Sequence, residues 1–172
     1  VGGSSSTYLP LHQLLDHGAS GVNFESVGGA MLEAYPEAAK QQRHHPSRPS
    51  SEANFPLHIG VRVRLFPLLS ALLAVYPDAA KHPDASGTTY PIHSCCNYGD
   101  KAPLSVIMAL AEASPGVLKL TNSDGDTPLL ITCKKMEKNF SEVAALLIER
   151  NAEAVMVANK AGNLAIHVTC ER

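Results

Sequence analysis

Apolar residues recur along the chain at helical spacing, and a turn signal follows each apolar stretch. Segments 68–76 and 143–147 illustrate the pattern, because Leu, Val or Tyr occupies positions three and four residues apart in each of them. This spacing places the side chains on one face of an amphipathic α-helix. Gly, Asn and Asp gather between the apolar stretches, as in segment 122–126, and favour turns. We therefore expect an all-α fold with at most vestigial hairpins.

Two short phrases repeat along the chain. The first phrase reads Leu-Pro-Leu-His in its first copy, and its copies lie at residues 9–12, 55–58, 90–93, 127–130 and 164–167. The second reads Tyr-Pro-Glu-Ala-Ala-Lys at its start, and its copies lie at 35–40 and 76–81, with weaker ones at 113–116 and 149–154. A repeat at a fixed period indicates stacked units that cannot bury their apolar faces alone.

The distance between copies of the first phrase gives the length of the unit. Pro56, Pro91, Pro128 and Ala165 occupy the same place in successive copies and are separated by 35, 37 and 37 residues. Pro10 lies 46 residues before Pro56, so the first interval holds an insertion of roughly ten residues.

These intervals predict a single domain over residues 1–172. The expected fold is a helical solenoid of stacked helix-turn-helix repeats, with four full units and the start of a fifth. Segment 41–54 is polar and rich in Pro and Ser, which predicts a flexible surface insertion. The units fall approximately at residues 7–40, 53–83, 84–121, 122–158 and 159–172.

Capping signals define the helices within a unit. Thr127 can cap a helix, and Pro128 suits its first turn because the missing N–H would have no partner there. Asn139 followed by Glu142 matches a capping box for a second, longer helix. Proline at the start of the second phrase should end the outer helix, at Pro36, Pro77 and Pro115. Each unit is thus predicted as turn, short inner helix, longer outer helix and Pro-marked turn.

The outer helix of the first unit carries the weakest helical signal. Gly28 and Gly29 lie within it, and each costs about 1 kcal/mol relative to Ala in a helix interior. We therefore expect a frayed unit at this edge of the array.

The repeated phrase resembles a known family. Segment 125–129, Gly-Asp-Thr-Pro-Leu, resembles the centre of the ankyrin-repeat consensus, and 162–167 is a degenerate copy of it. Because five copies occur in register, the resemblance covers nearly the whole chain. The units depart from the family in their length of about 37 residues rather than 33. They also depart at the Thr position, which is apolar at Leu9 and Phe55.

The resemblance implies that a partner would contact a concave face, formed by the turn tips and the exposed ends of the inner helices. Tyr98 and Arg62 are residue types that dominate interface energetics. The helix-end candidates are Arg62, Asn97, Tyr98, Lys134 and Lys135, with Asp16, His17 and Val63 at the same positions in other units. The tip candidates are Ser123, Asp124 and Asp126, with Asp84, Ser86 and Thr88 in the third unit.

The Cys and His residues follow the repeat rather than a catalytic or metal-binding pattern. Cys96, Cys133 and Cys170 occupy one position of the inner helix, and stacking should bury all three as small hydrophobes. Their spacing does not match structural zinc pairs. The resemblance implies that His12, His58, His93 and His167, which also share one position, hydrogen-bond locally and to the neighbouring unit. We therefore expect no metal, no cofactor, no small-molecule substrate and no enzymatic activity.

Charge narrows the choice of partner. The net charge is −2, which offers no general attraction to nucleic acid or an anionic membrane. Segment 40–64 is nonetheless basic, with five Lys and Arg residues against one Glu. No stretch has the roughly 20 apolar residues that a membrane helix needs, and the start lacks the features of a signal peptide. We expect an intracellular protein, cytoplasmic or nuclear.

These observations favour a non-catalytic scaffold that binds another protein. Two alternatives stay open. The chain could be a regulatory or recruiting module of a larger enzyme, such as a kinase or ubiquitin ligase, or it could bind nucleic acid through segment 40–64. The second alternative predicts binding that falls steeply with salt.

Overall fold

The computed structural model describes residues 10–16, 24–42 and 54–171, and this part of the chain is all-helical, with no strand. The α-helices are α1 (Pro10–Asp16), α2 (Phe24–Ala34), α3 (Pro56–Arg62), α4 (Phe66–Val75), α5 (Pro91–Asn97), α6 (Leu104–Ala113), α7 (Pro128–Lys135), α8 (Phe140–Arg150) and α9 (Ala165–Cys170). Short 3-10 helices lie between them, namely η1 (Pro36–Lys40), η3 (Pro77–Lys81), η4 (Gly99–Lys101), η5 (Pro115–Lys119) and η6 (Ala152–Met156).

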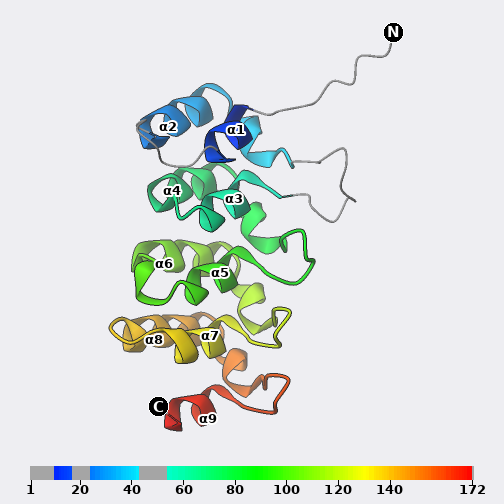
Figure 1. Cartoon of the computed structure of the whole chain (residues 1–172), viewed down its shortest axis with the longest axis vertical. Coiled ribbons are helices and arrows are strands. Elements are labelled where there is room, and N and C mark those ends of the chain that lie inside the picture. Colours follow the sequence, from blue (N-terminus) through cyan, green and yellow to red (C-terminus); the bar gives the residue numbers. More distant parts are fainter. Residues whose placement is uncertain (1–9, 17–23, 43–53, 172) are drawn as a thin grey trace.

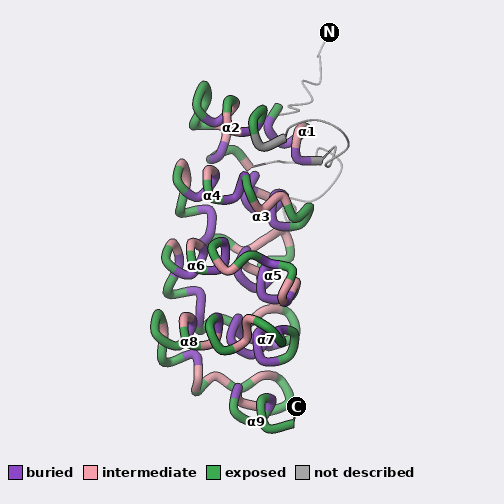
Figure 2. The backbone as a smooth tube through the Cα atoms, turned by 90° about the vertical axis from the view of Figure 1, so that its left-hand side faces the viewer, coloured by how far each residue is buried: buried purple, intermediate pink, exposed green. Residues whose placement is uncertain are grey.

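The helices stack in two columns (Figure 1). The odd-numbered helices form one column, in which each helix packs on the next, and α2, α4, α6 and α8 form the other. Each of the first four layers holds one helix from each column, and the fifth holds α9 alone among the described residues. Buried backbone segments recur in the successive layers (Figure 2). The predicted all-α fold is confirmed for the described residues. Most of the predicted insertion, at 43–53, lies outside them.

The start of each inner helix follows the repeated phrase. Pro occupies the first helical position of α3, α5 and α7, where its missing N–H leaves no bond unmade. Thr127 caps α7 as predicted, because its Oγ1 accepts a hydrogen bond from the Leu130 backbone N–H at 3.2 Å. In α5, where Tyr90 replaces Thr, the Tyr90 N–H instead donates to Nδ1 of His93 at 3.3 Å.

The predicted capping box of α8 does not form. Asn139 precedes the helix but makes no side-chain cap bond. Asp100, from the layer before, accepts hydrogen bonds from the backbone N–H groups of Glu137, Lys138 and Asn139 at 3.1–3.2 Å. A carboxylate from a neighbouring layer thus accepts the hydrogen bonds of the backbone N–H groups that lead into α8. A local sequence pattern could not predict this contact, because Asp100 lies far from α8 in the sequence.

The predicted Pro-marked turn after each outer helix is a turn of 3-10 helix. Tyr76 leaves helical geometry, as expected for a residue before proline, and η3 then begins at Pro77. In the fourth layer Asn151 has the same role without proline, because its Oδ1 accepts from the Glu153 N–H at 3.1 Å. Helix ending was therefore predicted correctly, whereas the 3-10 helix was not.

The predicted fraying of the first outer helix is not observed. Helix α2 continues through Gly28 and Gly29. A Cβ on Gly28 would lie 2.8 Å from the Leu68 side chain, whereas one on Gly29 would contact nothing within 4 Å. Gly28 therefore allows α2 to approach α4 closely, which offsets part of its cost in a helix.

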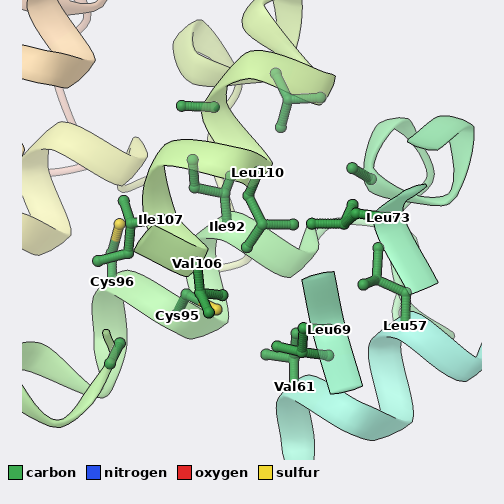
Figure 3. Packing of buried hydrophobic residues seen from close by; sticks show 14 of the residues in the cluster. Leu57, Val61, Leu69, Leu73, Ile92, Cys95, Cys96, Val106, Ile107 and Leu110 are labelled. Carbon is green, nitrogen blue, oxygen red and sulfur yellow. The ribbon is translucent and has the colours of Figure 1, made fainter. Parts of the chain in front are cut away.

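The core lies between the two columns and is almost entirely aliphatic. Leu69, Ile92, Ile107 and Leu110 are fully buried, and they pack together with Val106 near the third layer (Figure 3). Within the described residues, no helix is long and apolar enough to cross a bilayer.

Candidate functional site

The repeated histidines of the second and third units bond the inner helix to the end of the same unit. Nε2 of His58 donates to the His82 carbonyl at 2.9 Å, and Nε2 of His93 donates to the Leu120 carbonyl at 3.0 Å. Burial lowers the pKa of both rings, so both are neutral at pH 7, with the proton on the nitrogen that faces the carbonyl. The expected bond beyond the unit is made by His12, whose Nε2 donates to the Asn54 carbonyl at 3.3 Å. For His58 and His93 the prediction is wrong, because His82 and Leu120 lie at the ends of the same units as the rings that bind them.

The cysteines are core residues in the covered layers. Cys95, Cys96 and Cys133 are buried, and burial raises the pKa of Cys96 to about 12. Its reactive thiolate form is therefore scarce at neutral pH. The prediction that Cys170 is buried is wrong, because it is exposed on α9, the last helix of the stack. The described residues hold no group of three His, Cys, Asp or Glu side chains arranged to bind a metal.

The turn tips before α7 and α9 are Asx turns. Oδ1 of Asn122 accepts from the backbone N–H groups of Asp124 and Asp126 at 2.9 and 3.0 Å. Asn159, one unit later, accepts in the same way from Ala161 and Asn163. The same bonds thus fix these two tips relative to their inner helices.

The predicted tip residues differ in their surroundings. Ser123 and Asp124 are exposed, and Ser123 lines an open groove of about 430 Å³ that also includes Thr88 and Lys160. Asp126 is buried, at 6% exposure, and Lys134 Nζ donates to its two carboxylate oxygens at 2.6 and 2.7 Å. Asp126 and Lys134 therefore bind each other. The place of Asp126 in the tip predicted an exposed contact residue, and this prediction is wrong.

A second group of predicted residues meets at the ends of α3 and α5. The Tyr98 hydroxyl donates to the Arg62 carbonyl at 3.2 Å, and the ring packs edge-on against Phe66. The Arg64 guanidinium lies 4.5 Å from the centre of the Tyr98 ring, a cation–π geometry. The Tyr98 ring is thereby held in one orientation at the surface.

Arg64 was missed by the sequence reasoning. Its φ of 60° is the only positive value at a non-glycine residue in the described part of the chain. The left-handed region costs an L-residue roughly 1–2 kcal/mol. The next unit has Gly99 at the same place, also with φ 60°, so the repeat alignment could have shown Arg64 to be unusual. Strained positions of this type often mark functional sites.

Arg62 and Tyr98 also line a small cavity of about 120 Å³ between α3 and α5, together with Asp84, Ser94 and Asn54. Sites for small-molecule ligands usually measure about 300–1,000 Å³. This cavity is large enough for one side chain of a partner, but it is small for a substrate.

The predicted helix-end residues lie in one continuous strip, which we call the loop column and define as residues 62–66, 97–101 and 134–139. Tyr98 connects its first two segments. Asp100 connects the second to the third, and Gly99 packs so closely on the Lys135 carbonyl that a Cβ would lie 2.7 Å from it. Asn97 and Lys135 are exposed on this strip. The tip candidates lie at the other end of the inner helices, and the side chain of Asp16 and all of His17 lie outside the described residues.

No protein-family model matches the chain, and a search of curated proteins finds no match to it.

Proposed function

We propose that this chain is a helical solenoid of ankyrin-like repeats, with four full units and the start of a fifth, and that it is a non-catalytic scaffold for another protein. The partner would bind along the inner helices and the loop column. The repeated phrases, the regular pairing of helices and the histidine bonds that recur at the same position of successive units support the repeat assignment.

The observation that carries the functional proposal is the cluster formed by Tyr98, Arg62 and Arg64. It offers an aromatic ring and two guanidinium groups at the surface, the side chains most common among interface hot spots. Contacts with Phe66 and the Arg62 carbonyl fix the ring before a partner arrives. A fixed side chain loses little entropy on binding, so more of its contact energy appears as affinity.

The buried titratable groups support binding rather than chemistry. The raised pKa of Cys96 disfavours a nucleophilic thiolate. Both ring nitrogens of His93 are already occupied by backbone groups of its own chain, so it is unsuited to move protons to a substrate.

The test is selection of peptides from a random phage-displayed library on the folded chain. We expect peptides whose binding is lost when Tyr98→Ala and Arg62→Ala are combined, with circular dichroism showing that the variant keeps its helices. The matched control combines Tyr35→Ala with Lys40→Ala, which removes the same types of group from the exposed surface of the first layer. If no peptide distinguishes the two double variants, the proposed face is wrong.

A further inference from the structure

Most described Lys and Arg residues outside the loop column are held in ion pairs, whereas most of those within it are not. Five cations are held in ion pairs, namely Lys40, Lys81, Lys119, Lys134 and Arg150. Arg64, Lys101, Lys135 and Lys138 have no ion pair with a described residue, and all four lie in the loop column. Among the described Lys and Arg residues outside the loop column, Lys160 alone lacks an ion pair. Lys160 donates to the Ser123 carbonyl. The unpaired positive charge of the described chain is thus concentrated on one edge of the stack.

The sign of the charge on this edge opposes that of the whole protein. The loop column holds six Lys and Arg residues against two acidic residues, whereas the full chain has 14 basic and 16 acidic residues. One of the two acidic residues is Asp100, whose carboxylate is turned to three backbone N–H groups. Among the described residues, the surface outside the strip is therefore net acidic, and an acidic partner would meet a positive field along this strip.

Arg64 shows that one of these cations is kept at a cost in stability. Glycine would relieve its positive φ, and the following unit has glycine there. The arginine instead places its guanidinium over Tyr98 at the exposed edge. Folding alone does not explain the choice, because the same loop closes with Gly99 one layer later.

We propose that the loop column docks an acidic, extended segment of a partner protein. This inference rests on the proposed scaffold function and names the chemistry of the partner. The strip crosses three layers, and layers of packed helices lie about 10 Å apart, so an extended segment of about six residues would span it. Glu or Asp side chains about three residues apart would reach Arg64, Lys101 and Lys138 in turn.

The geometry favours a peptide over a nucleic acid. Proteins that bind single strands offer aromatic faces on which bases stack. Arg64 covers the Tyr98 ring, and the Tyr98 hydroxyl is bound to the Arg62 carbonyl, so this aromatic group is not an open stacking platform. The net negative charge outside the strip would also repel a long polyanion.

The experiment measures binding of a fluorescein-labelled, glutamate-rich decapeptide by anisotropy. Its glutamine counterpart and a single-stranded oligonucleotide of equal length are measured beside it. We expect the glutamate peptide to bind at least about tenfold more tightly than the glutamine peptide, and to weaken as salt rises from about 50 to about 300 mM. The oligonucleotide should bind more weakly than the glutamate peptide.

Two variants localise the binding. Arg64→Gly should weaken binding about three- to tenfold without loss of folding, because glycine suits the local φ. Lys101→Gln combined with Lys138→Gln should weaken it about tenfold. The matched control, Lys81→Gln combined with Lys119→Gln, removes two exposed lysines outside the strip and should leave affinity within about twofold of wild type.

Three results would overturn the inference: equal binding of the glutamate and glutamine peptides, wild-type affinity in both strip variants, or tighter binding of the oligonucleotide. These failures are distinct from failure of the scaffold proposal. If the library yields neutral peptides that still depend on Tyr98 and Arg62, the scaffold function stands and only the acidic character of the partner is wrong.

Discussion

The fourth and fifth layers have closely related sequences but very different surroundings. Leu129 in α7 is 2% exposed, whereas Ile166, at the same repeat position in α9, is 59% exposed. Cys133 is buried and its counterpart Cys170 is exposed. Helix α7 packs against α5 on one side and α9 on the other, while α9 packs on α7 and η6 (Figure 1). Burial in this molecule therefore depends on the place of a layer in the stack and not on its local sequence.

Truncating the shared apolar position should give the largest difference between the two layers. Leu129→Ala removes a fully enclosed side chain and should lower the free energy of unfolding by about 2–5 kcal/mol. Ile166→Ala removes a side chain that already faces water, and the cost should stay below about 1 kcal/mol. Urea denaturation followed by circular dichroism compares them. Equal losses would mean that α9 is covered in solution.

Two tip glycines have the same positive φ, but only one of them has a close neighbour where a Cβ would lie. Gly125 and Gly162 have φ values of 82° and 81°, so alanine should cost roughly 1–2 kcal/mol at either site. At Gly125 the added Cβ would also lie 2.9 Å from the Lys160 backbone nitrogen, whereas at Gly162 it would meet nothing within 4 Å. Gly125→Ala should therefore cost about 1–3 kcal/mol more than Gly162→Ala in the same denaturation experiment. Similar losses would show that the Lys160 segment moves aside freely.

The acidic residue of the ion pair in the fourth layer can be replaced by the residue at the same position of the fifth. Asp126 binds Lys134, and the corresponding residue after 37 positions is Asn163. Asp126→Asn keeps the shape but removes the charge, and should cost about 1–2 kcal/mol because Lys134 can turn partly to water. Asn163→Asp is the control and should change stability by less than about 0.5 kcal/mol. If high salt abolished the first loss completely, the pair would behave as an exposed one.

The features of the fold that could be predicted from the sequence are those that depend on residues close together along the chain. Helices, their starts at proline and their ends before Pro77 depend on neighbours within four residues, so the sequence predicted them. The repeat period also predicted which residues would be equivalent. Contacts between layers were not predictable from local pattern, as the Asp100 carboxylate and the close approach at Gly28 show.

The candidate site was predicted in part for the same reason. Tyr98, Arg62 and Lys135 were chosen from their place in the unit, and the structure puts them on one strip. Asp126 was chosen on the same basis, yet Lys134 and Asn159 enclose it. Arg64 was overlooked because its significance lies in a backbone angle and a contact with the next layer, which composition and spacing do not reveal.

The smallest expected effect is on the pH dependence of stability. It concerns His93, whose position is occupied by Leu130 one layer later. Burial lowers the pKa of His93 in the folded state, although the charges of Asp126 and Asp84 oppose the shift. The unfolded ring therefore binds a proton more readily, and stability present above its ordinary pKa of about 6.5 is lost as pH falls through the folded value.

Wild-type protein should consequently unfold at lower urea at about pH 5.5 than at about pH 7.5. His93→Leu should reduce that difference but not abolish it, because the pKa of His58 is lowered by burial as well. The lost bond to the Leu120 carbonyl should cost only about 0.5–1.5 kcal/mol at neutral pH, since Leu120 lies at the surface. His167→Gln, in the exposed layer, is the control. If His167→Gln reduced the pH dependence of stability as much as His93→Leu does, the buried histidines would not be the source of that dependence. The position of a layer in the stack would then not determine the protonation of this repeated histidine.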